Sequence, residues 1–178
     1  SFKKLVKVGG TAVIAACAII FSMIMIGMTV GWTFGWKSMD CLYLGVIGFG
    51  RIGQAVARIG AAFGMKIIAY SRTQHEEGKL LADYVPLDTL LSQSDIISIH
   101  CPLTAETTEL INATTLQKMK NSAILINTSR GGVLNESDVK SALESGKLRY
   151  CAVDVAAAEP IPADSPLLSA PNCIITPH

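Results

Sequence analysis

The chain has 178 residues, half of them hydrophobic, and a formal net charge of +1. A chain of this length buries one sizeable core, so we expect one domain with an appendage. The balanced charge, without lysine and arginine clusters interleaved with aromatic residues, argues against a nucleic-acid partner. The five cysteines lie far apart without a C-x-x-C spacing, which indicates reduced thiols in a cytoplasmic protein and argues against a disulfide framework or a metal site.

Residues 1–40 are apolar and differ from the rest of the chain. No charged residue lies between Lys7 and Lys37, and residues 11–30 are long and apolar enough for a membrane-spanning helix. The lysines before this stretch would keep the N-terminus cytoplasmic and move the following residues outside. We therefore favour a buried helix that packs on a partner subunit or a further lobe, and keep the membrane segment as the alternative.

A buried strand, a glycine loop and a helix follow one another from residue 43. Residues 43–47 are apolar, and apolar side chains recur at helical spacing over residues 52–63. Between them, Gly48, Gly50 and Gly53 match the G-x-G-x-x-G pattern. The first glycine permits a tight turn, the second lets backbone approach a pyrophosphate, and the third lets helix and strand touch. A second apolar run over residues 65–70 completes a β-α-β unit whose helix N-terminus suits a phosphate.

The residues after this second strand bear on the choice of cofactor. An acidic residue about 20 residues beyond the glycines commonly binds the ribose 2′-hydroxyl, but here the chain reads Ser71-Arg72-Thr73. A carboxylate would repel a 2′-phosphate, whereas a hydroxyl and a guanidinium bind one. The sequence therefore favours NADP over NAD, and the alternative is that Arg72 is a solvated loop residue.

From residue 80 the chain alternates short apolar strands with amphipathic helices. Strands are predicted over residues 95–100, 123–127, 150–155 and 173–176, and helices over residues 87–92, 114–120 and 136–145. The proline-rich residues 159–166 are predicted to be a loop, because a strand follows them. This order predicts an α/β fold, a Rossmann-type doubly wound parallel sheet with helices on both faces.

Several chemically useful side chains stand where the predicted strands end. In open α/β sheets, ligands bind beyond the carboxyl ends of the strands. This edge collects an arginine, two carboxylates and two histidines: Arg130, Asp154, Glu159, His100 and His178. Each of them alone could be a turn cap or a solvated surface residue. Together, above a glycine loop, they indicate a site.

Four motifs resemble the D-isomer-specific 2-hydroxyacid dehydrogenases, a family that includes phosphoglycerate dehydrogenase and glyoxylate/hydroxypyruvate reductase. They are residues 100–107 (HCPLTAET), residues 125–132 (LINTSRGG), the segment from Asp154 to Glu159-Pro160, and the ending Thr176-Pro177-His178. The resemblance covers residues 41–178. It implies hydride exchange between a nicotinamide ring and C2 of a 2-oxo or 2-hydroxy acid.

The resemblance also implies a role for each matched residue. Arg130 would grip the substrate carboxylate, His178 would protonate the developing alkoxide, and Glu159 would hydrogen-bond that histidine. Asp154 would hold the nicotinamide carboxamide, and His100 is interpreted as a structural strand-end residue. The remainder of the cofactor would contact Gly48, Gly50, Arg51, Ile52, Gly53, Ser71, Arg72, Cys101, Pro102, Thr107, Thr128 and Ser129.

Both parts of the family's substrate domain are absent, so we expect a fragment. Residues 41–178 would be the dinucleotide-binding domain, and residues 1–40 an apolar helix and Trp-rich turn left from a dimer arm, or a membrane segment. Trp32 and Gly35-Trp36 resemble a turn of the glyoxylate/hydroxypyruvate branch. Such a fragment would bind NADP or NAD but reduce 2-oxo acids poorly, because the lobe that closes over substrate is missing. The full-length protein is expected to be a homodimer.

Two other functions stay open. A non-catalytic nicotinamide-sensing or corepressor-like module would need the fold but not Arg130, Glu159 and His178 together, so the presence of all three favours an enzyme. A membrane-anchored cofactor-binding domain would use residues 11–30.

Overall fold

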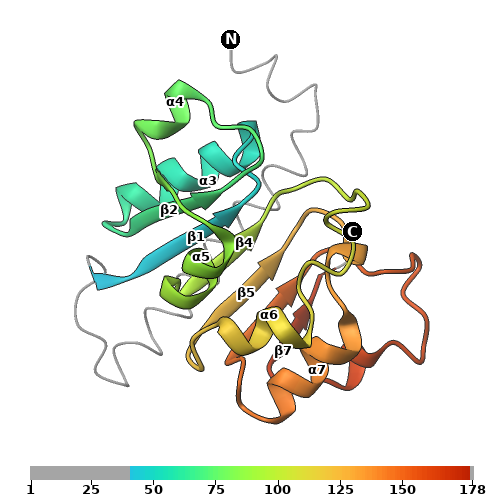
Figure 1. Cartoon of the computed structure of the whole chain (residues 1–178). Coiled ribbons are helices and arrows are strands. Elements are labelled where there is room, and N and C mark those ends of the chain that lie inside the picture. Colours follow the sequence, from blue (N-terminus) through green and yellow to red (C-terminus); the bar gives the residue numbers. More distant parts are fainter. Residues whose placement is uncertain (1–40, 177–178) are drawn as a thin grey trace.

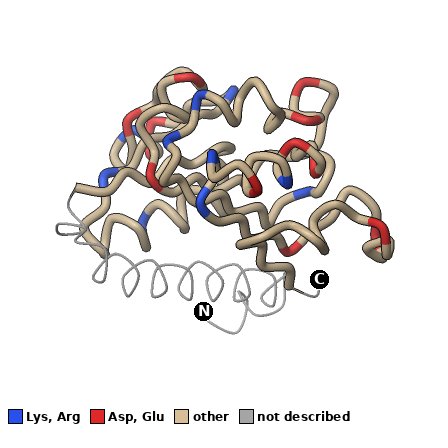
Figure 2. The backbone as a smooth tube through the Cα atoms, turned by 90° about the horizontal axis from the view of Figure 1, so that it is seen from below, with Lys and Arg blue, Asp and Glu red and all other residues tan. Residues whose placement is uncertain are grey.

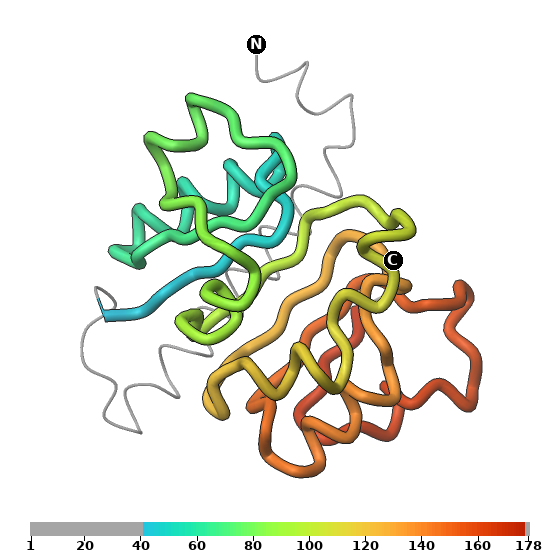
Figure 3. The backbone as a smooth tube through the Cα atoms, viewed as in Figure 1, coloured from blue at the N-terminus to red at the C-terminus, as the bar shows by residue number. Residues whose placement is uncertain are grey.

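The computed structural model describes residues 41–176. They form a seven-stranded, wholly parallel sheet in the order β3-β2-β1-β4-β5-β6-β7 (Figure 1). The chain passes from β1 outward to β3, then returns beside β1 and continues outward to β7 (Figure 3). The strand order thus reverses between β1 and β4, and open α/β sheets bind ligands at such a switch point.

The strands are short and mostly apolar. They are β1 (Tyr43–Ile47), β2 (Lys66–Tyr70), β3 (Asp83–Tyr84), β4 (Ile96–Ile99), β5 (Ile124–Asn127), β6 (Tyr150–Val153) and β7 (Cys173–Ile175). The helices are α3 (Arg51–Ala62), α4 (Glu76–Lys79), α5 (Leu87–Gln93), α6 (Ala113–Lys118) and α7 (Glu136–Glu144), with short 3-10 turns η2 (Gly131–Val133) and η3 (Pro166–Ser169). Every residue of β4 and β5 is buried, as expected for parallel strands covered on both faces.

The sheet has an apolar core on each face. On one face, Leu90 of α5, Leu116 of α6 and Val139 of α7 are almost completely buried against the strands. On the other face, Val56 and Ala57 of α3 pack over β1 and β2. Burying each large aliphatic side chain contributes about 1.5–3 kcal/mol, so these contacts hold the strands in register. Lysine, arginine and acidic residues are dispersed around this core, with neither sign gathered in one place (Figure 2).

The predicted Rossmann-type sheet is confirmed, and each predicted strand or helix is found within two residues of its predicted ends. The pair α4 and β3 was not predicted, because segments of four and two residues are too short for a periodic pattern. The predicted apolar helix and Trp-rich turn of residues 1–40 lie outside the described residues. Within residues 41–176, no helix has the length and apolarity needed to cross a membrane.

Candidate dinucleotide site

The loop between β1 and α3 closes tightly on the end of β4. Gly48 has a φ of +90°, and its N–H donates to the Tyr70 carbonyl at 2.8 Å. A Cβ on Gly48 would lie 2.4 Å from the backbone nitrogen of Cys101, so only glycine fits. A Cβ on Gly53 would lie 2.3 Å from the Gly48 carbonyl oxygen. These two glycines therefore permit the tight turn and the close contact between helix and strand.

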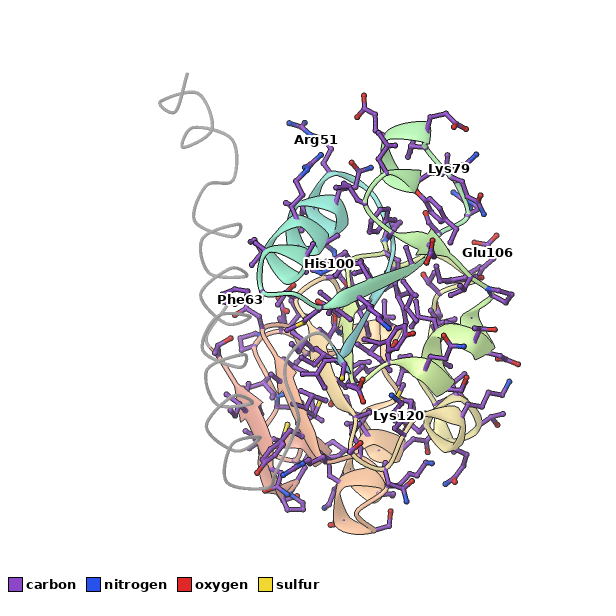
Figure 4. All side chains as sticks on the ribbon, turned by 90° about the vertical axis from the view of Figure 1, so that its left-hand side faces the viewer. Arg51, Phe63, Lys79, His100, Glu106 and Lys120 are labelled. Carbon is purple, nitrogen blue, oxygen red and sulfur yellow. The ribbon has the colours of Figure 1, made fainter. Side chains whose placement is uncertain are left out.

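Gly50 is in a different environment. A Cβ built on Gly50 meets no atom within 4 Å. Gly50 is the N-cap of α3, no side chain caps this helix, and its first turn holds no acidic residue. The first N–H groups of α3 therefore stand beside open space at the positive end of the helix dipole. Arg51 extends away from the start of the helix (Figure 4), and Ile52 is half exposed. This cradle suits an anion such as a pyrophosphate.

Phe49, between the two glycines, anchors the loop from behind. Its side chain is buried, and its ring meets the ring of Tyr84 edge to face with 5.5 Å between centroids. A Cβ on Gly78 of α4 would lie 2.3 Å from the Tyr84 hydroxyl and 3.1 Å from the Phe49 ring. The unpredicted pair α4 and β3 thus supports the glycine loop.

An acidic side chain faces the end of β2. Ser71 is half-buried and Arg72 is exposed; Arg72 Nη1 lies 3.9 Å from Glu106 Oε2. The Thr104 hydroxyl donates to Glu106 at 2.8 Å, and this bond, with the backbone N–H of Glu106 and the charge of Arg72, lowers the pKa of Glu106. Sequence reasoning assigned Glu106 no role, although it lies inside the recognised motif of residues 100–107.

His100 directly follows β4, and the residue is half-buried. Its Nε2 lies 2.8 Å from the Ser98 hydroxyl, and burial lowers the pKa of His100 to about 4. The imidazole is therefore uncharged at neutral pH and cannot act as an acid there. This geometry agrees with the structural role expected for His100.

The loop after His100 is held by its own threonines. The Thr107 hydroxyl donates to the Pro102 carbonyl at 2.6 Å and accepts from the Thr104 N–H at 2.7 Å. Cys101, at the start of this loop, is buried, and burial raises the pKa of its thiol. A thiol in this state is a packing group and a poor nucleophile.

Asn127, at the end of β5, shapes the next loop. Its fully buried amide donates to the Arg130 carbonyl at 3.0 Å and accepts from the Ser129 N–H at 3.0 Å and hydroxyl at 2.9 Å. Arg130 is exposed, and its guanidinium donates to the Ser129 carbonyl at 2.7 Å. Sequence reasoning gave Asn127 no separate role; the signal was a polar residue ending an apolar strand before Thr-Ser-Arg-Gly-Gly.

The Thr128 hydroxyl is buried and has no hydrogen-bond partner in the described part of the chain. Leaving a buried hydroxyl without a partner costs about 1–3 kcal/mol. This cost is offset when a ligand bonds the hydroxyl. Together with the open cradle at Gly50 and the uncapped start of α3, the Thr128 hydroxyl fits a bound dinucleotide.

The ends of β5, β6 and β7 are tied together at Asp154. Its N–H donates to the Asn127 carbonyl at 3.0 Å, and its carboxylate accepts from the Thr176 hydroxyl. Glu159 lies on the exposed loop after β6, with Oε1 3.4 Å from the Ala156 nitrogen.

The structure thus gathers the ends of six strands, the glycine loop and the loops carrying Arg130 and Glu159 at one edge of the sheet. Pro177 and His178 lie outside the described residues. Within residues 41–176, no group of three or more His, Cys, Asp or Glu side chains could hold a metal ion.

Comparison with known proteins places the chain in a family. The family model for the "D-isomer specific 2-hydroxyacid dehydrogenase, NAD binding domain" matches residues 31–178. A hydroxypyruvate reductase of Blautia hydrogenotrophica is 46% identical over 148 residues, which cover 83% of this chain and 46% of that protein. A glyoxylate reductase of Korarchaeum cryptofilum is 43% identical over 156 residues, 83% of this chain and 47% of that protein. The chain spans about half the length of these curated relatives.

Solved structures agree. D-lactate dehydrogenase with NAD⁺ from Lactobacillus jensenii has a TM-score of 0.79 and 33% identity, covering 93% of this chain and 58% of that one. A D-isomer specific 2-hydroxyacid dehydrogenase from Lactobacillus delbrueckii ssp. bulgaricus, in its NAD-complexed form, has a TM-score of 0.74 and 36% identity, covering 79% of this chain and 47% of that one. This chain therefore belongs to the D-isomer specific 2-hydroxyacid dehydrogenase family, whose NAD-binding domain it contains.

Proposed function

We propose that this chain is the cofactor-binding part of an oxidoreductase that exchanges hydride between a nicotinamide dinucleotide and a 2-oxo or 2-hydroxy acid. The observation that carries the proposal is the open cradle at Gly50, before an uncapped helix, in a chain of this family. The printed names of its relatives, hydroxypyruvate reductase and glyoxylate reductase, support a small 2-oxo acid as the substrate class. We place the full-length protein in the cytoplasm as a homodimer.

Each loop at the sheet edge then has a binding role. The first N–H groups of α3, with Arg51, hold the pyrophosphate, and the Thr128 hydroxyl gains the partner that it otherwise lacks. Asp154 orients the nicotinamide carboxamide. The remaining cofactor contacts come from Ile52, Ser71, Arg72, Cys101, Pro102, Thr107 and Ser129. When bound, the nicotinamide supplies or accepts the hydride.

The catalytic residues in this proposal are Arg130, Glu159 and His178. The planar guanidinium of Arg130 binds the substrate carboxylate and polarises the 2-oxo group. His178 donates a proton to the alkoxide oxygen, and Glu159 hydrogen-bonds the protonated imidazole. The exposure of Arg130 and Glu159 on loops at the sheet edge supports these roles. A purely nicotinamide-sensing module would not need this set.

We further propose a preference for NADP over NAD. Its support is the exposed Arg72 at the end of β2, where no carboxylate occupies residues 71–73. Glu106 opposes the preference, because its carboxylate lies 3.9 Å from the guanidinium that would bind the 2′-phosphate.

The test is a titration of the purified chain with NADPH and with NADH, followed by nicotinamide fluorescence. We expect saturable binding of both, with NADPH tighter. Arg72→Asp should weaken NADPH relative to NADH several-fold, because it exchanges attraction of the 2′-phosphate for repulsion. Binding of neither nucleotide would overturn the proposed function, and an unchanged ratio in Arg72→Asp would assign Arg72 to the solvated surface.

A further inference from the structure

Two cysteines face each other across β6 and β7. Cys151 and Cys173 are paired residues in the register of these parallel strands, so their side chains point to the same face of the sheet. Cys151 belongs to the apolar cluster on this face of the sheet, and Cys173 packs against the same cluster. Cys151 is completely buried, whereas Cys173 is half-buried. Neither is bridged in the structure, and the cofactor site uses neither.

The two thiols differ in reactivity. Interaction with the neighbouring Cys151 thiol lowers the pKa of Cys173, although burial and the charge of Glu136 oppose this effect. The same interaction, with burial, raises the pKa of Cys151. The thiolate is the reactive form of cysteine, so Cys173 is the nucleophile of the pair as well as the more exposed thiol. Cys151 stands beside it as a resolving thiol.

We propose that Cys151 and Cys173 form a peroxide-sensitive dithiol that closes into a reversible disulfide between β6 and β7. The Cys173 thiolate attacks hydrogen peroxide, the O–O bond breaks, and a Cys173 sulfenic acid forms while the leaving hydroxide takes a proton and becomes water. The Cys151 sulfur then attacks the Cys173 sulfur. The S–O bond breaks, and hydroxide leaves with the Cys151 proton as a second water. Two thiols lose two electrons, and one hydrogen peroxide becomes two water molecules.

The strand geometry permits this bond and makes it labile. Adjacent strands lie about 4.7–4.9 Å apart, which is inside the range of about 4.4–6.8 Å between the Cα atoms of disulfide-bonded cysteines. The paired side chains run parallel to each other, so the Cβ atoms must approach before the sulfurs join. The resulting strain makes a disulfide easier to reduce, and strained disulfides are typical of regulatory sites.

Formation of the disulfide should also disturb the cofactor site; this consequence rests on the proposed function. Cys151 lies three residues before Asp154 on β6, and Cys173 lies three residues before Thr176 on β7. Asp154 and Thr176 hydrogen-bond each other at the strand ends. Turning the two Cβ atoms toward each other twists the backbone of both strands at the cysteines and displaces this pair, so oxidation should weaken dinucleotide binding.

Peptide mapping of the full 178-residue chain tests the disulfide. The reduced protein is treated with hydrogen peroxide, its free thiols are alkylated, and it is cleaved with trypsin. No lysine or arginine occurs in residues 150–178, so both cysteines fall in one peptide. We expect this peptide to take two alkyl groups before oxidation and none afterwards. Cleavage before Asp164 with an aspartate-specific protease should leave two halves that separate only with dithiothreitol. Pairing of either thiol with another cysteine, or over-oxidation without a link, would overturn the proposal.

Variants assign the roles. Cys41→Ser removes an exposed thiol before β1 and should leave the link unchanged. Cys151→Ser should trap a sulfenic acid on Cys173 that reacts with dimedone, whereas Cys173→Ser should leave Cys151 reduced. A dimedone adduct on Cys151 instead would contradict the assignment.

NADH titrations before and after peroxide test the consequence. We expect several-fold weaker binding after oxidation, restored by dithiothreitol and absent in Cys173→Ser. Unchanged affinity despite a formed link would refute the coupling to the site. Failure of the reduced protein to bind any dinucleotide would refute the proposed function and leave the mapped disulfide standing.

Discussion

Replacing Gly50 with alanine should weaken cofactor binding while leaving the fold intact. It would enter open space, whereas a methyl group on Gly53 would meet the Gly48 carbonyl oxygen at 2.3 Å. We expect Gly50→Ala to keep its fold, at a cost under about 1 kcal/mol for the changed N-cap. Its NADH affinity should fall by about tenfold or more, or ~1.4 kcal/mol, because the methyl group occupies the pyrophosphate space.

Gly53→Ala is the matched control for Gly50→Ala, because the same added methyl group should here destabilise the fold. Thermal unfolding should show a loss of roughly 2 kcal/mol or more, since backbone must move to admit the methyl group. If Gly50→Ala binds NADH as tightly as the wild type does, the pyrophosphate does not bind beside Gly50.

Glu106 is predicted to moderate the choice between NADPH and NADH. An exposed ion pair is worth about 0.2–1 kcal/mol, and the pair with Arg72 must be broken before a 2′-phosphate binds that guanidinium. Glu106→Gln should therefore tighten NADPH about two- to fivefold and leave NADH unchanged. Fluorescence titration measures both. Glu109→Gln, an exposed carboxylate on the same loop, is the control and should change neither affinity.

His100 makes the stability depend on pH. Burial lowers its pKa from 6.5 to about 4 in the folded state, so below pH 6.5 the unfolded chain binds a proton that the folded chain does not. The contribution of His100 is complete above pH 6.5, falls as the pH drops, and levels off below pH 4. Between pH 7 and pH 5 the expected loss is about 2 kcal/mol.

Urea unfolding of the wild type and of His100→Gln measures this term. The variant should lose that part of the pH dependence, while His75→Gln, at an exposed histidine, should retain it. If the free energy of unfolding depends on pH equally in the wild type and in His100→Gln, burial does not lower the pKa of His100.

At the scale of elements, the start of α7 anchors the loop after β6. Glu136 accepts hydrogen bonds from the Ala157 N–H at 2.7 Å and the Ser165 hydroxyl at 3.0 Å, and so spans the loop that carries Glu159. Glu136→Ala should reduce the free energy of unfolding by about 1–2 kcal/mol, because it removes both charge-assisted bonds.

Proteolysis reports the loop directly. A protease that cuts before aspartate should cleave Glu136→Ala faster before Asp164, which is exposed on this loop, than it cleaves the wild type. Glu144→Ala, in the last turn of the same helix and 3.8 Å from Lys140, should behave as the wild type does. Equal cleavage of all three proteins would mean that other contacts hold the loop.

Some helices and strands can be predicted from the sequence more easily than others. Strands such as β4 and helices such as α3 carry a full apolar period, so their existence and type followed from side-chain spacing. The segments α4 and β3 carry none, and they form because Tyr84 and Gly78 pack on Phe49. Local pattern thus identified the layers of the sheet and missed the support of the glycine loop.

At the scale of the whole molecule, we expect this chain to bind the dinucleotide but to catalyse hydride transfer only slowly. The chain spans about half the length of its curated relatives, and the described loops leave Arg130 and Glu159 exposed. Hydride transfer needs a site that excludes water. We expect saturable NADPH binding together with slow reduction of glyoxylate or hydroxypyruvate, measured by loss of nicotinamide absorbance. Turnover by the 178-residue chain at an ordinary enzymatic rate of about 1–1000 per second would contradict this expectation.

The sequence by itself determined the fold class, the glycine loop and the family, because these depend on residue type and spacing along the chain. Only the tertiary structure showed that Glu106 faces Arg72, that Asn127 shapes the loop before Arg130, that the Thr128 hydroxyl lacks a partner, and that Cys151 and Cys173 are register partners on neighbouring strands. The Arg72–Glu106 and Cys151–Cys173 pairs depend on how the elements are arranged in the fold, which brings together residues far apart in the chain; Arg72 and Glu106 are 34 positions apart. Local periodicity carries no information about such pairs.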